Sequence, residues 1–182
     1  MDDLEILKQM ISPRALIALT EEYQKKIAVL DEPQETDSVV TLRNMPDDAF
    51  VIKVDQFSSP NNVFQGSHGE CKRADYVIIS PEKKRIIYIE IKRTKDEWDS
   101  IVKQLMGAEC FVKYCREIGK TFWNENSFLN GYESRFVSIG HTGRSIPKQK
   151  TRIEKLVPAH NTPSQALKID WPHHIQFNLL AG

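Results

Sequence analysis

Two apolar runs, residues 73–80 and 85–93, flank the polar stretch PEKK, and this pattern predicts a β-hairpin. Both alternating sets of side chains in the hairpin are largely Ile, Val and Tyr. Both faces must therefore be covered by other parts of the chain. A hairpin that needs a layer above it and a layer below it favours an α/β fold in which helices cover a mixed sheet.

Three charged residues, Asp75, Glu90 and Lys92, interrupt this apolar hairpin at one end. If the chain reverses in the middle of PEKK, Asp75 lies opposite Glu90, with Cβ atoms about 4.5–5.5 Å apart. Lys92 follows Glu90 on the same face. Two carboxylates that close repel each other unless a cation lies between them, so a divalent metal ion fits, with a lysine beside it for a phosphate or an activated water. The alternative is an ion-pair cluster at the end of the hairpin.

The remaining pattern predicts helices around the hairpin. Apolar residues recur at helical spacing within residues 3–30, with a break at Ser12-Pro13. We further expect a strand within 49–57, a loop over 58–70, a helix capped by Thr94 or Asp96 and ended by Gly119, a strand over 135–141 and a last strand over 174–180. This order describes a single α/β domain over 1–182, with a helical N-terminus (1–30), a core (46–141) and a C-terminal extension (142–182).

The amino-acid composition limits the kinds of function and cellular location that this chain can have. Lys+Arg and Asp+Glu both number 25, which excludes a wholly basic surface for gripping nucleic acid but allows a local basic patch. The three cysteines lack CxxC spacing, so we expect reduced thiols and neither a disulfide framework nor a structural zinc site. The N-terminal MDDLEILKQM has no apolar signal-peptide region, and no run of about 18 apolar residues occurs. We therefore expect a soluble cytoplasmic protein.

The hairpin acids, the Glu-Ile-Lys triplet and the following helix resemble the PD-(D/E)xK nuclease superfamily, which has the restriction-endonuclease-like fold. That family places an aspartate on one strand and E-x-K on the next, in an αβββαβ core whose central mixed sheet is flanked by helices. Asp75 looks like the first acid, Glu90 the second and Lys92 the lysine. Gln104 is similar to the glutamine often found on the following helix, and Ala74 stands where the family nominally has proline.

The resemblance implies a metal-dependent nuclease that hydrolyses phosphodiester bonds, with DNA favoured over RNA. Asp75, Glu90 and the backbone carbonyl of Ile91 would hold Mg²⁺, for which Mn²⁺ can substitute. Lys92 would position the attacking water or offset developing charge, and Gln104 would orient the lysine or touch the substrate backbone. A homodimer or a partner subunit is compatible with the family. The rival reading is a catalytically silent domain of the same fold that binds nucleic acid or protein.

Other residues are candidates for supporting roles. Many superfamily members carry a glutamate on the first helix, and here Glu21 or Glu22 is available. Other charged and aromatic residues are further candidates. Arg73 faces Lys92 in the expected register, which favours a phosphate-binding spot. Arg93, Lys95, His68 and Glu70 are more simply solvated residues. A zinc site that uses both His173 and His174 is disfavoured, because adjacent residues of an extended chain point to opposite faces. A candidate backbone-gripping loop, more simply a solvated one, holds Arg144, Lys148, Lys150, Arg152 and Lys155. The candidate stacking partners for unpaired bases are Trp98, Trp123, Phe122 and Phe128, with burial favoured for Trp98.

Overall fold

The structure, a computed structural model, describes residues 1–31, 39–92, 97–140, 159–170 and 174–182. It is an α/β protein with two mixed sheets. The helices are α1 (Asp3–Met10), α2 (Trp98–Phe122) and α3 (Phe177–Ala181), and three short 3₁₀ turns occupy Pro13–Ala15, Val54–Gln56 and Pro163–Gln165.

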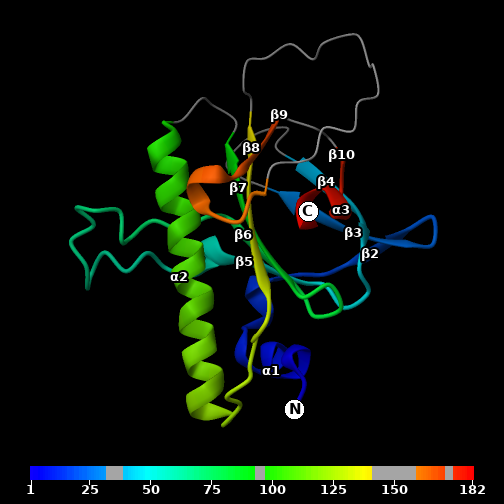
Figure 1. The fold of residues 1–182 in the computed structure, drawn as a ribbon, viewed down its shortest axis with the longest axis horizontal. Coiled ribbons are helices and arrows are strands. Elements are labelled where there is room, and N and C mark those ends of the chain that lie inside the picture. The colour runs from blue at the N-terminus through cyan, green and yellow to red at the C-terminus, as the bar shows by residue number, and fades with distance from the viewer. Residues whose placement is uncertain (32–38, 93–96, 141–158, 171–173) are drawn as a thin grey trace.

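A six-stranded sheet forms the centre of the molecule (Figure 1). In spatial order it contains β1 (Leu16–Ile17), β5 (Phe50–Lys53), β6 (Tyr76–Ser80), β7 (Arg85–Lys92), β8 (Glu133–Gly140) and β9 (Leu167–Asp170). Strands β5, β6 and β7 are antiparallel neighbours, whereas β8 and β9 run parallel to β7. A second, four-stranded sheet has the order β10 (His174–Gln176), β4 (Val39–Met45), β3 (Lys25–Asp31) and β2 (Thr20–Glu22).

The register expected for the central hairpin is confirmed. Tyr76 pairs with Ile89 and Ser80 pairs with Arg85, so the chain reverses within PEKK as predicted. The two faces of the hairpin belong to two separate buried clusters. The side chains of β6 and β7 therefore alternate between the two faces as the sequence indicated.

The two faces of the central sheet are covered by different kinds of element. Residues of α1 and α2 pack on the face that carries Val77 and Tyr88. The opposite face, with Ile78 and Ile87, packs against β3, β4 and α3. The second layer expected to be helical is thus mainly a β-sheet, as the arrangement to the right of the central strands shows (Figure 1).

The prediction of helix over residues 13–30 is wrong. Helix α1 ends at Met10, and the following chain forms β1 and the hairpin β2–β3. Tyr23 and Gln24 both have positive φ, which suits a two-residue turn joining twisted antiparallel strands. Apolar side chains of β3 reach the second core at period two, through Ala28 and Leu30. The helical spacing of apolar residues was therefore coincidental.

The bounds of the later helices and strands also differ from the predicted bounds. Helix α2 runs past Gly119 to Phe122, and Gly119 serves close packing: a Cβ there would lie 2.3 Å from Cδ1 of Phe128. Thr94 and Asp96 lie outside the described residues, and Glu97 occupies the N-cap position. The last predicted strand is only His174–Gln176, after which Phe177 and Leu180 bury one side of α3. The predicted C-terminal extension thus contributes β9, β10 and α3 to the two layers.

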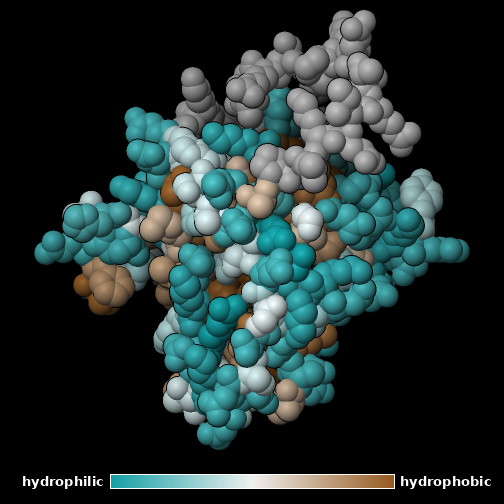
Figure 2. Space-filling view, viewed as in Figure 1, coloured by the Kyte–Doolittle hydropathy of each residue, from teal (hydrophilic) through white to brown (hydrophobic). Residues whose placement is uncertain are grey.

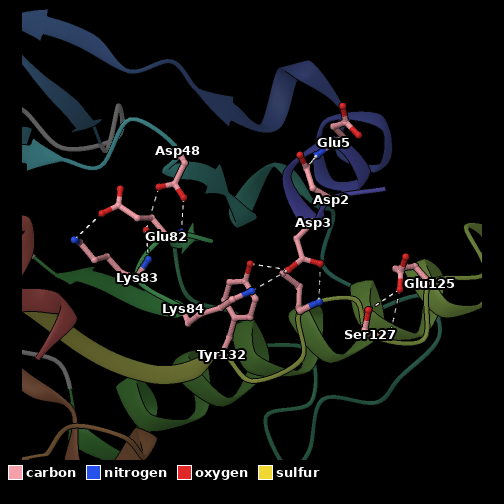
Figure 3. Close-up of polar contacts among 12 residues, drawn as sticks. Asp2, Asp3, Glu5, Asp48, Glu82, Lys83, Lys84, Glu125, Ser127 and Tyr132 are labelled. Carbon is pink, nitrogen blue, oxygen red and sulfur yellow. Dashed lines mark hydrogen bonds and ion pairs between the residues drawn. The ribbon is translucent and has the colours of Figure 1, made fainter.

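The turn of the central hairpin is braced by the N-terminal helix (Figure 3). Asp3 accepts hydrogen bonds from the Tyr132 hydroxyl at 2.7 Å and from the Leu129 N–H at 3.2 Å. The Lys84 ammonium lies 3.7 Å from Asp3 and 4.4 Å from the centre of the Tyr132 ring. Asp48 accepts from the Ser80 hydroxyl and from the N–H of Glu82. These contacts fix the point at which the hairpin reverses.

Across the described ranges, no helix is both long enough and apolar enough to cross a membrane.

Candidate functional site

The pairing of Tyr76 with Ile89, continued by one residue, places Asp75 beside Glu90 at the open end of the hairpin. Asp75 directly precedes β6, and its Oδ2 accepts a hydrogen bond of 2.7 Å from the N–H of Ile91. The neighbouring residue on β7, Glu90, has a side chain that is 0% exposed. The Asp75 backbone carbonyl accepts from the N–H of Val54 at 2.7 Å, which holds the start of β6 against the end of β5.

Lys92 completes the trio on the α2 side of the sheet. Its ammonium lies 3.0 Å from Oε1 of Glu90, and its side chain is 31% exposed. The lysine therefore links a fully buried carboxylate to the solvent. A buried carboxylate is stabilised by such a partner, although moving both charges out of water is costly.

Adjacent strands extend the same face beyond the trio. Ser138 of β8 pairs in register with Glu90, and Lys168 of β9 pairs in register with Ser138. Two strand spacings separate Glu90 from Lys168, or about 10 Å. The Lys168 ammonium lies 3.6 Å from the centre of the Trp98 ring, at the first residue of α2. Neither Ser138 nor Lys168 was predicted, although Leu167 and Ile169 carry a period-two signal for β9.

Helix α2 closes over the segment that leads into Asp75. Gly107 packs on the Lys72 backbone so tightly that a Cβ would lie 1.7 Å from the Lys72 carbonyl oxygen. About two turns earlier, Ser100 accepts a hydrogen bond of 2.8 Å from the Lys72 ammonium. Gln104 lies between these two contacts along the helix, and its buried Oε1 accepts no hydrogen bond from the described residues. A buried amide oxygen of this kind is uncommon in folded proteins.

The donor set fits a hard divalent cation. Two carboxylates and one ammonium leave one net negative charge in the trio, and carboxylate oxygens are the ligands that Mg²⁺ and Mn²⁺ prefer. No cluster of three or more His, Cys, Asp or Glu side chains suited to a metal occurs among the residues that the structure describes. A metal at this position would depend on the two acids together with backbone or water oxygens.

The glutamates proposed for the first helix lie on a different element. Glu21 and Glu22 belong to β2 of the four-stranded sheet. Glu21 pairs with Lys26 at 3.2 Å and Glu22 pairs with Arg43 at 3.2 Å. Both side chains are thus engaged in surface ion pairs on the second sheet, and the structure does not bring them to Asp75.

Residues 57–71, here called the arm, follow the 3₁₀ turn after β5 and lead towards Asp75, which precedes β6. Glu70 organises this segment, because its carboxylate accepts from the N–H groups of Gly66 and His68, each at 2.9 Å. Hydrogen bonds from its own N–H and from that of His68, together with the one from Gly66, lower the pKa of Glu70. Arg73 donates to the carbonyls of Val54 and Asp55 rather than facing Lys92.

The aromatic candidates separate into packed and exposed residues. Phe128 is buried, and Trp123 donates to the Gln9 side chain at 3.0 Å. Trp98 is half-buried beneath Lys168. Phe122 is exposed, but it ends α2, far from the first turn of the helix that lies near the site. None of the four presents a free ring beside the acids.

Several candidates lie outside the described residues: Arg93, Lys95, Arg144, Lys148, Lys150, Arg152, Lys155 and His173. His174 is exposed on β10 and pairs with Thr41. Of the cysteines, Cys115 is a poor nucleophile, because burial raises the pKa of its thiol to about 12.

No protein-family model, curated protein or solved structure matches this chain. The candidate site therefore stands on the register, burial and contacts of its own residues.

Proposed function

We propose that this protein is a Mg²⁺-dependent nuclease that hydrolyses phosphodiester bonds, with DNA favoured over RNA as substrate. The observation that carries the proposal is the meeting of Asp75, Glu90 and Lys92 at one end of a buried hairpin. Burying a glutamate fully lowers the stability of the protein, so its presence here calls for a functional role. Metal binding at a catalytic site is such a role.

The element order supports a restriction-endonuclease-like core. Leaving out β1–β4, the chain passes through α1, β5, β6, β7, α2 and β8, which follows the αβββαβ order of that fold. The aspartate precedes the second of these strands, and the E-x-K triplet lies on the third. Gln104 lies on the helix that follows.

The proposal gives each of these residues a role. Asp75 and Glu90 would hold Mg²⁺ with the backbone carbonyl of Ile91, and the bound ion would lower the pKa of a water and offset charge on the phosphodiester. The N–H of Ile91 fixes one oxygen of Asp75 and so orients the carboxylate. The Lys92 side chain is 31% exposed, so it could hold the attacking water or a phosphate oxygen. Gln104 would orient Lys92 or contact the substrate backbone.

The first test is cleavage of labelled single-stranded, duplex and branched DNA and of RNA, with Mg²⁺ or Mn²⁺. Wild type would be compared with Asp75→Asn, Glu90→Gln and Lys92→Ala. Lys83→Ala is the matched control, because it removes a lysine from the turn at the other end of the same hairpin. We expect metal-dependent cutting in wild type and Lys83→Ala, and a loss of at least about 100-fold in the site variants. Cutting that survives in Lys92→Ala contradicts the proposal.

A second readout separates a nuclease from a silent module. Ligand binding to the native state raises stability, so Mg²⁺ or Mn²⁺ should raise the melting temperature of wild type in a saturable way. Glu90→Gln should abolish that shift. Saturable metal binding without cleavage of any substrate would favour the silent nucleic-acid- or protein-binding domain. No metal-dependent shift would favour a simple ion-pair cluster.

A further inference from the structure

The outer face of α2 carries an apolar stripe that nothing in the described structure covers. Met106, Cys110 and Tyr114 follow each other at intervals of one helical turn, so they share one face. Met106 is 50% exposed and Tyr114 is 63% exposed. The buried residues of α2 lie on the opposite face: Ile101, Leu105, Ala108, Val112, Cys115 and Gly119. The stripe is thus separate from the core-facing side of the helix.

A charged residue lies beyond each end of the stripe. Lys103 precedes Met106 and Glu117 follows Tyr114, both exposed and both at helical spacing with the stripe. Lys103 makes no ion pair with the residues that the structure describes, whereas Glu117 accepts from Lys120 at 2.7 Å. The face therefore carries a lysine at one end, apolar residues in the middle and a glutamate, paired with Lys120, at the other end.

This arrangement is complementary to itself. Lys103 and Glu117 lie at equal distances along the helix from Cys110, and so do Met106 and Tyr114. If two copies of α2 pack antiparallel about a two-fold axis at Cys110, each Lys103 meets a Glu117. Each Met106 then meets a Tyr114, a favourable sulfur–aromatic pairing. A two-fold axis presents the same patch from both copies, and self-complementarity is what such an interface requires.

We propose that a second copy of this chain docks on the outer face of α2, so that the protein forms an antiparallel α2–α2 homodimer centred on Cys110. The charge pattern selects this occupant, since a partner helix must carry opposite charges in reversed order and α2 itself does. Helix α2 has 25 residues and a length of about 37 Å, enough for the whole stripe to engage.

The arm adjoins the same surface. The Lys103 side chain lies against Gly69, where a Cβ would meet its Cδ at 2.8 Å. The rings of Phe57 and Phe111 are 6.2 Å apart, which joins the base of the arm to α2. Beyond this base the arm projects outward past α2 (Figure 1), and apolar atoms are visible on the projection (Figure 2). Val63, at 77% exposure, is one such arm residue that a second copy could cover.

Sedimentation velocity across a range of protein concentrations tests the dimer directly. Wild type should show a reversible monomer–dimer equilibrium. Lys103→Glu and Glu117→Lys should each weaken dimerisation by about tenfold or more, because each change turns two attractive pairs per dimer into repulsive ones. The double variant Lys103→Glu/Glu117→Lys restores opposite charges in the antiparallel arrangement. It should therefore recover most of the lost affinity.

Two controls keep the result interpretable. Lys25→Glu makes the same charge change on the exposed β2–β3 hairpin and should leave the equilibrium unchanged. A short bismaleimide should link two chains through Cys110, and Cys110→Ser should abolish that link. Thermal unfolding monitored by circular dichroism confirms that each variant is folded.

Three outcomes would overturn the proposal: a monomer at all concentrations, a dimer insensitive to both single reversals, or a double variant weaker than either single variant. The measurement uses neither metal nor substrate. Its result is thus independent of the nuclease proposal, and either can fail while the other stands.

Discussion

At the scale of single residues, Gly107 links the packing of α2 to the candidate site. A side chain at this position would collide with the Lys72 carbonyl, and Lys72 belongs to the segment that delivers Asp75 to the hairpin. The Lys72 N–H donates to the Gly69 carbonyl at 2.9 Å and Gly107 lies within α2, so movement of either backbone is costly. The geometry of Asp75 thus depends on a residue that does not touch it.

We expect Gly107→Ala to lower the free energy of unfolding by about 1–3 kcal/mol, as overpacking does. It should also reduce metal-dependent cleavage, because the strand start at Asp75 must shift. Gly119→Ala is the matched control, since it makes a similar collision with Phe128 at the other end of the helix. Urea unfolding should show a loss of stability in both variants. Equal loss of cleavage in both, measured well below their melting temperatures, would disprove the specific link to Gly107.

At the scale of elements, the arm is ordered by polar contacts rather than by a core. Its apolar residues Phe57, Val63 and Phe64 are all substantially exposed. The Glu70 carboxylate instead joins two backbone N–H groups across the turn. A single protonation event can therefore loosen the whole segment.

The pKa of Glu70 is lower in the folded protein than the ordinary value of 4.5. Its stabilising contribution is thus complete above that ordinary value and is lost as the pH falls below it through the folded-state pKa. We expect amide hydrogen exchange in residues 66–70 to accelerate, after correction for intrinsic rates, as the pH falls through this window. Glu70→Gln should show fast exchange at every pH. Unchanged protection of wild type at acidic pH would contradict this role.

At the scale of the whole molecule, Asp3 ties the N-terminal helix to both the hairpin turn and the loop before β8. Its two carboxylate oxygens accept from different partners, Leu129 and Tyr132, and both partners are buried. Burial, followed by the hydrogen bond and charge of Asp3, raises the pKa of Tyr132, so the hydroxyl stays protonated as a donor.

Asp3→Ala should lower the free energy of unfolding by at least about 2 kcal/mol, because it leaves a buried N–H and a buried O–H without their acceptor. Asp2→Ala removes only the helix cap to Glu5 and should cost about 1 kcal/mol. Chemical denaturation measures both. An Asp3 variant as stable as the Asp2 variant would show that the brace contributes little.

The sequence was informative where local chemistry is unambiguous. Alternating β-branched residues around PEKK predicted the hairpin and its register, which the pairs from Tyr76–Ile89 to Ser80–Arg85 confirm. The β2–β3 hairpin was missed because its apolar spacing also satisfies a helix, and its turn has no glycine to mark it. The second sheet depends on contacts between residues far apart in the sequence. Its strand β10 pairs with β4 across most of the chain, and no local sequence pattern predicts that pairing. The same holds for the row through Ser138 and Lys168.

The positions of the strands along the chain indicate the order in which they pair during folding. Asp75 and Glu90 belong to one continuous hairpin, whereas the neighbour β8 can join β7 only after the chain has passed through the whole of α2. Contacts between residues near in sequence close small loops and form early, while parallel pairing across a long crossover forms late. We therefore expect the hairpin that carries Asp75 and Glu90 to form before β8 pairs with β7, while water still solvates both carboxylates.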